Sequence, residues 1–129
     1  CLGYRVTYKD RSICYITDNE LYPPGNPYYN EFYVDQLVEF LRGANVLITD
    51  CTYFEEDYAA KVGWGHSSID QVARLAHRAE VDTLYLYHHD PDQVDEDIDR
   101  KLALAQEFLT NEGSKTKCVA PKEKDRVKI

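Results

Sequence analysis

The segment "VDTLYLYHHDPDQ", residues 81–93, decides how the chain is interpreted. Its first half, residues 81–87, is rich in apolar and β-forming side chains and predicts a short strand. The strand runs directly into His88, His89 and Asp90. Two imidazoles and a carboxylate at a strand end occur either in a plain polar loop or at the edge of a functional site, and the rest of the chain must distinguish the two.

Strands and helices alternate on both sides of this segment. Two β-rich runs, residues 3–8 and 12–17, flank a short polar turn and predict a hairpin. Apolar residues at helical spacing then predict helices that alternate with short apolar strands, in the order helix 33–44, strand 45–49, helix 66–80, strand 81–87, helix 90–109 and strand 117–121. Such alternation is typical of an α/β fold with a mainly parallel sheet.

Length and composition indicate one globular domain. The chain has 129 residues, of which 43% are apolar and 29% charged, close to the average for packed domains. The formal net charge of −8 disfavours a large nucleic-acid footprint, because such a footprint needs a basic face. No apolar run approaches the roughly 18 residues that a membrane span needs, so no membrane association is expected.

The cysteines and the lack of methionine give two further expectations. The four cysteines have no spacing typical of a zinc ribbon, and Cys14 and Cys51 fall in apolar runs where free thiols are usually buried. A reducing, cytoplasmic location is therefore expected. The sequence contains no methionine and opens directly on a strand, which leads us to expect a piece of a longer polypeptide.

Four polar side chains fall at positions that an α/β sheet brings together. Asp18, Asp50 and His88 each follow a predicted strand, and His66 opens the helix after Asp50. Ligand sites of parallel sheets gather at the carboxyl ends of the strands, and this mixture of nitrogen and oxygen donors suits a borderline metal such as zinc. Asp50 and His66 also suit a pair in which the carboxylate orients an imidazole that moves a proton. Each residue taken alone fits an ordinary turn or helix cap as well.

Four segments carry a recognisable set of motifs. A hairpin ending in a Gly-Asp-Thr aspartate is matched by "GYRVTYKDRSICYITDNE", with Thr17 where glycine is usual, and a strand followed by an acidic residue, Ala or Cys, and Thr is matched by "GANVLITDCTY". A Gly-His-Ser-Thr helix entrance is matched by "GWGHSSIDQVARLAHRAEV", and a Leu-Thr-His-Phe-Ser-Pro strand end by "LYLYHHDP". In this order the motifs resemble the metallo-β-lactamase-fold hydrolases, and among them the phosphodiesterase-like branch of tRNA 3′-processing endonucleases and cyclic phosphodiesterases.

The resemblance implies a fold and a metal centre. The chain would be the second half of a metallo-β-lactamase αββα sandwich, with residues 1–129 forming the C-terminal half of the domain. The resemblance implies two divalent ions per complete site, with zinc expected and manganese or iron as alternatives. The family's main metal motif, His-x-His-x-Asp-His, belongs to the first half of that fold and does not occur in these 129 residues.

The resemblance also assigns roles to individual residues. Asp18 would bridge the two ions and His88 would be a terminal ligand of one of them, whereas Asp50 and His66 would be the acid–base pair near the leaving group. The implied substrate is a phosphodiester, either a small molecule or a nucleotide. A nucleic acid is disfavoured by the net charge and by segment 19–33, which is longer than in the tRNA-processing branch. Further side chains are expected to line the substrate site: Tyr22, Tyr28, Tyr29, Trp64 and His89.

Two other interpretations stay open at this point. A receiver-like signalling domain with Asp50 as phosphoacceptor fits the length, the acidity and the alternation of strands and helices. A non-catalytic half-domain fits the absence of the main metal motif. Such a half would form a homodimer, or associate with the missing N-terminal half, through its apolar sheet face. As a metal-dependent hydrolase, the chain alone is expected to be inactive, because two ligands are too few to fix a catalytic zinc ion.

Overall fold

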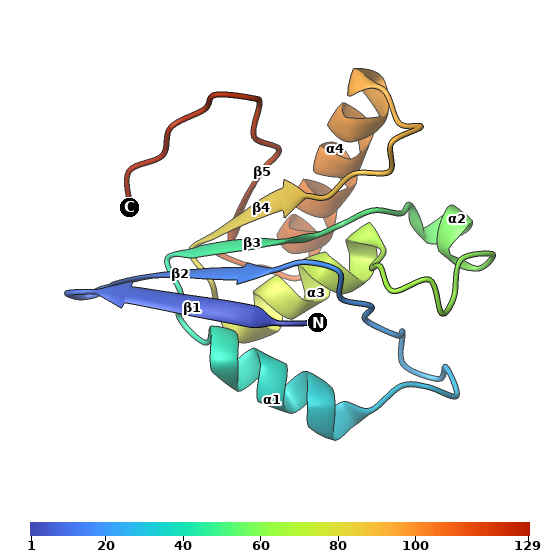
Figure 1. The fold of residues 1–129 in the computed structure, drawn as a ribbon, viewed down its shortest axis with the longest axis horizontal. Coiled ribbons are helices and arrows are strands. Elements are labelled where there is room, and N and C mark those ends of the chain that lie inside the picture. The colour runs from blue at the N-terminus through green and yellow to red at the C-terminus, as the bar shows by residue number, and fades with distance from the viewer.

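A single five-stranded sheet forms the centre of the molecule in the computed structural model, which describes residues 1–129 (Figure 1). The strands lie side by side in chain order: β1 (Gly3–Tyr8), β2 (Arg11–Ile16), β3 (Val46–Asp50), β4 (Thr83–Tyr87) and β5 (Lys117–Val119). The β1–β2 pair is antiparallel, and the three other pairs are parallel. The predicted N-terminal hairpin and the mainly parallel α/β sheet are therefore confirmed.

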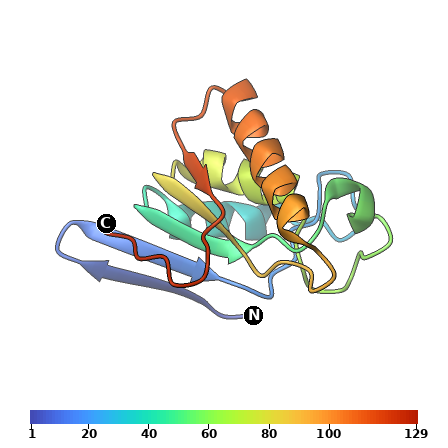
Figure 2. The ribbon, with the colours of Figure 1, turned by 90° about the horizontal axis from the view of Figure 1, so that it is seen from above.

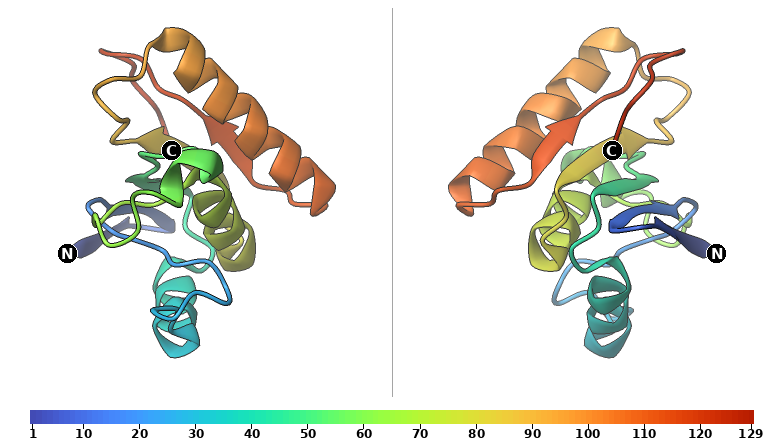
Figure 3. Two further views of the ribbon diagram at one scale, coloured as in Figure 1. Left: turned by 90° about the vertical axis from the view of Figure 1, so that its right-hand side faces the viewer. Right: turned by 90° about the vertical axis from the view of Figure 1, so that its left-hand side faces the viewer.

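Three long helices cover one face of this sheet, as Figures 2 and 3 show. These three are α1 (Glu31–Leu41), α3 (Ile69–Ala79) and α4 (Asp95–Asn111). A further helix, α2 (Glu55–Tyr58), is a single turn. The short helix α2 lies beyond the carboxyl ends of the strands, within a segment that sequence patterns leave as a loop or a frayed helix (Figure 1). None of the helices combines the length and apolar character that crossing a membrane requires.

The core lies between the sheet and the helices because every second strand residue points that way. Ile16 of β2, Leu47 of β3 and Leu84 of β4 are buried on this face. They meet α3, whose inward residues Val72 and Ala76 are also fully buried. Small side chains on α3 let the helix axis approach the sheet closely, so the carboxyl ends of β2, β3 and β4 are held at fixed positions.

Segment 18–21, which follows β2, is held against the start of α3. Ser68 is the N-cap residue of α3, but its hydroxyl makes no capping hydrogen bond. The neighbouring Ser67 hydroxyl instead donates to the Asn19 carbonyl at 2.6 Å and accepts from the Leu21 amide at 3.0 Å. This pair of bonds fixes the chain directly after Asp18 relative to the chain directly after His66.

Candidate metal and acid–base site

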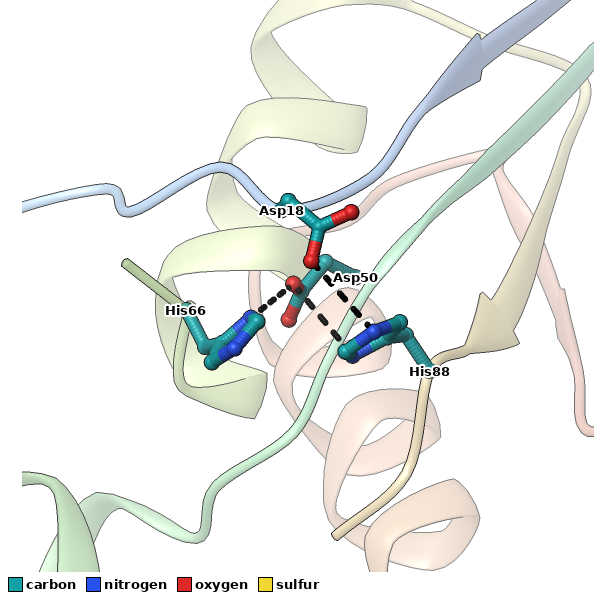
Figure 4. Close-up of side chains that lie close together, drawn as sticks. All are labelled: Asp18, Asp50, His66 and His88. Atoms are coloured by element: carbon teal, nitrogen blue, oxygen red, sulfur yellow. Dashed lines mark hydrogen bonds and ion pairs between the residues drawn. The ribbon is translucent and has the colours of Figure 1, made fainter. Parts of the chain in front are cut away.

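Four side chains meet at the carboxyl edge of the sheet (Figure 4). One ligand atom from each of Asp18, Asp50, His66 and His88 lies within 4.8 Å of the others. The sheet order explains this, because β2, β3 and β4 are neighbours and each delivers one of these residues at its end. His66 arrives from the loop before α3, which the parallel bridge Tyr53–Ser68 ties back to the chain after β3.

Two of these residues have left-handed backbone conformations. Asp18 has a φ of 52° and His88 a φ of 54°, a region that Asp, Asn and His occupy more readily than most residues other than glycine. In each case the turn begins directly after a strand and directs the side chain toward the shared site. A conformation of this kind costs free energy, and here it occurs at the ends of β2 and β4, the two strands that flank β3.

Asp50 and His66 form the tightest contact in the cluster. His66 Nδ1 lies 2.6 Å from Asp50 Oδ2, and the Asp50 side chain is 0% exposed. The other Asp50 oxygen accepts from the Thr52 amide and hydroxyl, at 3.2 and 2.8 Å. These bonds offset the cost of burying a carboxylate. A hydrogen bond from Nδ1 to Asp50 fixes the His66 ring and leaves Nε2 as the nitrogen that can exchange a proton with a substrate.

Asp18 and His88 form the open side of the cluster. Asp18 Oδ1 lies 3.4 Å from His88 Nε2, and the two side chains are 66% and 38% exposed. A tetrahedral ion with bonds of about 2.0–2.2 Å holds its ligand atoms about 3.3–3.6 Å apart. The spacing and donor types of this pair therefore suit two ligands of one divalent ion. The His88 ring also stacks on the His66 ring, with centroids 4.8 Å apart.

Thr52 and Lys101 form hydrogen bonds to the residues and backbone around the site, and neither was identified from the sequence. The Thr52 hydroxyl lies 2.8 Å from Asp50 Oδ1 and 2.8 Å from the His88 carbonyl. The Lys101 side chain is fully buried, and its Nζ donates to the carbonyls of Cys51 at 2.7 Å and Thr52 at 3.4 Å. Burial lowers the pKa of this ammonium. A sequence signal for Lys101 exists, since it shares the inward face of the predicted helix with apolar residues three and four positions away.

Glu20 is a third residue that the sequence analysis did not identify. Its two carboxylate oxygens accept hydrogen bonds from the amides of Gly63 and Gly65, both at 2.8 Å, and from the Tyr58 hydroxyl at 2.9 Å. Burial, followed by the nearby Glu20 carboxylate, raises the pKa of Tyr58. Glu20 thus joins the chain after Asp18 to the glycine-containing loop that leads into His66.

The residues expected to line the substrate site lie in three different places. Tyr22 and Tyr29 border a small cavity beside α3, and the Tyr22 and Tyr28 rings lie 5.5 Å apart. Trp64 is 61% exposed on the loop that leads into His66. His89 points away from Asp18 and His88, and its Nδ1 lies 3.8 Å from the Cys51 sulfur. Burial, followed by the charges of Lys101 and His88, lowers the pKa of His89 to about 4.

Comparison with known proteins assigns the family. A model of the family described as "Beta-lactamase superfamily domain" matches residues 1–89, which contain the whole four-residue cluster. Ribonuclease Z of Thermoplasma acidophilum is 45% identical over 58 residues, and ribonuclease Z of Thermoplasma volcanium is 40% identical over 58 residues. Each match covers 45% of this chain and 19% of the relative, so the chain matches about a fifth of the length of these proteins.

A solved structure agrees with this assignment at the level of the fold. The metallo-beta-lactamase fold protein YhfI from Bacillus subtilis superposes with a TM-score of 0.64 at 18% sequence identity. The superposition covers 93% of this chain and 41% of YhfI. The family match, the order of strands and helices and the strand-end cluster agree, and this chain therefore belongs to the beta-lactamase superfamily and has the metallo-β-lactamase fold.

Proposed function

We propose that this chain contributes one part of the active site of a metal-dependent hydrolase that cleaves phosphodiesters. The observation that carries the proposal is the pairing of Asp18 with His88 at 3.4 Å, directly beside the 2.6 Å contact of Asp50 with His66. One pair has the spacing of two metal ligands, and the other has the contact of an oriented proton donor. The similarity to proteins named ribonuclease Z supports a phosphodiester as the substrate class.

Asp18 and His88 would hold the metal. Both side chains reach solvent, so an ion and a substrate have access to them. A bound divalent ion would lower the pKa of a water molecule and stabilise negative charge on a phosphoryl oxygen. Nitrogen and oxygen ligands suit zinc, with manganese or iron as alternatives, and two ions per complete site are proposed.

His66 would donate a proton to the departing oxygen, with Asp50 as its positioning partner. The buried Asp50 carboxylate accepts from His66 Nδ1 and holds the ring in a fixed orientation. It also selects the tautomer whose Nε2 faces the substrate side. Asp50 itself is 0% exposed and held by Thr52, so it suits this supporting role better than that of a phosphoacceptor, and the N-terminal antiparallel hairpin does not suit a receiver domain.

The remaining ligands would come from outside these residues. A catalytic zinc ion usually takes three protein ligands, and Asp18 with His88 supplies two. The chain matches 19% of the ribonuclease Z proteins and covers 41% of YhfI. We therefore propose that residues 1–129 are the C-terminal half of a larger domain, whose other half covers the helix-free sheet face. The net charge of −8 favours a small or nucleotide phosphodiester over a long nucleic acid.

The proposal is tested by separating metal binding from turnover. In the protein that contains this chain, His66→Ala should lower the rate of hydrolysis of a dinucleotide, whose alkoxide leaving group needs a proton, by about 10²–10⁴-fold and leave the metal content unchanged. Asp18→Asn should lower both the rate and the metal content, because it removes a ligand. Metal content is measured by plasma emission spectroscopy on the purified proteins.

Two results would overturn these assignments. Loss of metal in His66→Ala would make His66 a ligand, and full metal content in Asp18→Asn would remove Asp18 from the metal site. For the chain of 129 residues alone, calorimetric titration with Zn²⁺ should show at most weak binding that His88→Ala abolishes. Tight binding of two ions by this chain would contradict the proposal that further ligands come from elsewhere.

A further inference from the structure

The only tryptophan of the chain is placed on the loop that delivers His66. Trp64 is 61% exposed, although tryptophan is normally highly buried. It lies two residues before His66, and two residues of chain span at most about 7 Å. A large exposed aromatic ring at this distance from a proposed proton donor needs a reason.

The backbone on both sides of the ring is fixed. The Trp64 amide donates to the Lys61 carbonyl at 3.1 Å, which closes a four-residue turn with Gly63 in its third position. Gly63 has a φ of 86°, the left-handed value that a type II turn needs there. The Glu20 carboxylate then accepts from the amides of Gly63 and Gly65, the two neighbours of Trp64. The loop is therefore held in place by Glu20, which lies shortly after the end of β2 at Ile16.

The indole ring itself is held from one side. The Lys61 ammonium lies over the ring, 4.0 Å from its centroid, an attractive cation–π contact. The residue remains 61% exposed despite this contact. Exposed aromatic rings on a held backbone are the side chains on which planar bases stack in proteins that bind single-stranded nucleic acids or nucleotides.

We propose that Trp64 is a stacking platform for the base of a nucleotide whose phosphate reaches the Asp18–His88 side of the site. The proposal rests on the proposed function, which it narrows from phosphodiesters in general to those that carry an aromatic base. Glu20 is the positioning residue of this platform and Lys61 its brace. The net charge of −8 favours a mononucleotide unit over a long strand as the bound ligand.

Intrinsic fluorescence tests the platform directly, because Trp64 is the single tryptophan. The metal-free chain is titrated with adenosine 5′-monophosphate and, separately, with ribose 5-phosphate, which has the same sugar and phosphate but no base. Saturable quenching by the nucleotide, without saturable quenching by ribose 5-phosphate, is expected. Equal effects of the two ligands, or quenching that rises linearly without saturation, would overturn the proposal.

Three variants extend the test. Trp64→Leu should weaken binding of adenosine 5′-monophosphate at least about fivefold, measured by saturation-transfer NMR on the nucleotide protons. Tyr8→Leu removes an aromatic ring that is 74% exposed on the distant hairpin and should leave binding unchanged. Glu20→Gln should lower the fluorescence anisotropy of Trp64 and weaken nucleotide binding. The glutamine amide has a single oxygen, so it cannot accept hydrogen bonds from both glycine N–H groups as the carboxylate does.

The results separate this inference from the proposed function. Undiminished nucleotide binding by Trp64→Leu, with an unchanged circular dichroism spectrum, would disprove the platform and leave the metal and His66 assignments intact. Saturable nucleotide binding together with normal metal content and turnover in His66→Ala would support the platform and disprove the proposed role of His66.

Discussion

The two faces of the sheet carry similar side chains and have different surroundings. On the face toward α1, α3 and α4, Leu47, Leu84 and Cys14 are 0% exposed. On the opposite face, Val6 is 65% exposed and Tyr8 is 74% exposed. The strand pattern is apolar on both sides, which is typical of parallel sheets that are covered on both sides. The pattern favours a sheet that is covered on both faces, and the chain's own helices cover one of them.

Part of the second face is crossed by the C-terminal segment (Figure 2). Tyr85 and Ile48 of the sheet line a groove together with Pro121, Val127 and Ile129. The segment leaves β1 uncovered, and Val127 and Ile129 remain 53% and 43% exposed themselves. A cover of this kind buries little apolar surface, so we expect it to contribute much less to stability than the helices on the opposite face.

The largest contrast should appear when one apolar residue on each face is truncated. Leu84→Ala on the helix-covered face should lower the free energy of unfolding by about 2–5 kcal/mol, because it leaves a cavity in a packed core. Val6→Ala on the open face should change it by less than about 0.5 kcal/mol. Both values come from urea denaturation followed by circular dichroism. A cost at Val6 that equals the cost at Leu84 would mean that the open face is covered in solution.

The two adjacent histidines also differ in their surroundings. His88 faces the open site, whereas burial lowers the pKa of His89 to about 4 from an ordinary 6.5. Between these two pH values the unfolded chain binds more protons at His89 than the folded chain does, so the free energy of unfolding should fall as the pH falls from 6.5 to about 4. His89 accounts for a decrease of at most about 3 kcal/mol in the free energy of unfolding, because each pKa unit corresponds to about 1.36 kcal/mol.

His89→Gln should therefore flatten the dependence of stability on pH in this window. The measurement is a series of urea denaturations of both proteins between pH 4 and pH 7.5. The two curves are compared by slope, so that any stability difference from lost packing at pH 7.5 is removed. An unchanged slope in the variant would show that His89 is accessible to protons in the folded state.

The sheet and the cluster could be predicted because both follow from repeating local patterns. Strand and helix periods indicate the element order, and parallel strands must bring their carboxyl ends to one edge. Asp18, Asp50 and His88 could therefore be expected to meet from their positions along the chain, and His66 could be placed beside them at a helix entrance. The family motifs supported the same set of residues.

The contacts of the supporting residues could not be predicted, because their partners are remote in sequence. Lys101 bonds to the carbonyl of Cys51, 50 residues away, and Glu20 bonds to the amide of Gly63, 43 residues away. No periodic pattern encodes such pairs, since they depend on how α4 and the loop before α3 pack in three dimensions. The sequence could not distinguish the single turn α2 from a loop, because four residues are too few to show a helical period.

The smallest effect on stability, and the sharpest test of the open face, should come from making that face polar. Tyr4 and Val6 point to the same side of β1 and are 56% and 65% exposed, so Tyr4→Thr with Val6→Thr should change the free energy of unfolding by less than about 0.5 kcal/mol. Threonine retains the β-branched shape that strands favour. The expected change lies in self-association, because exposed apolar sheet faces pair with one another.

Sedimentation velocity at increasing protein concentration measures this association. If the open face forms a homodimer of this chain, the unsubstituted protein should become dimeric as the concentration rises, and the double variant should stay monomeric. The covered-face variant Leu84→Ala is the matched control, because its substitution lies behind the sheet and should leave association unchanged wherever the protein remains folded. If the unsubstituted chain is monomeric at all concentrations, the homodimer is excluded. That result would favour the other half of a larger domain as the partner of this face.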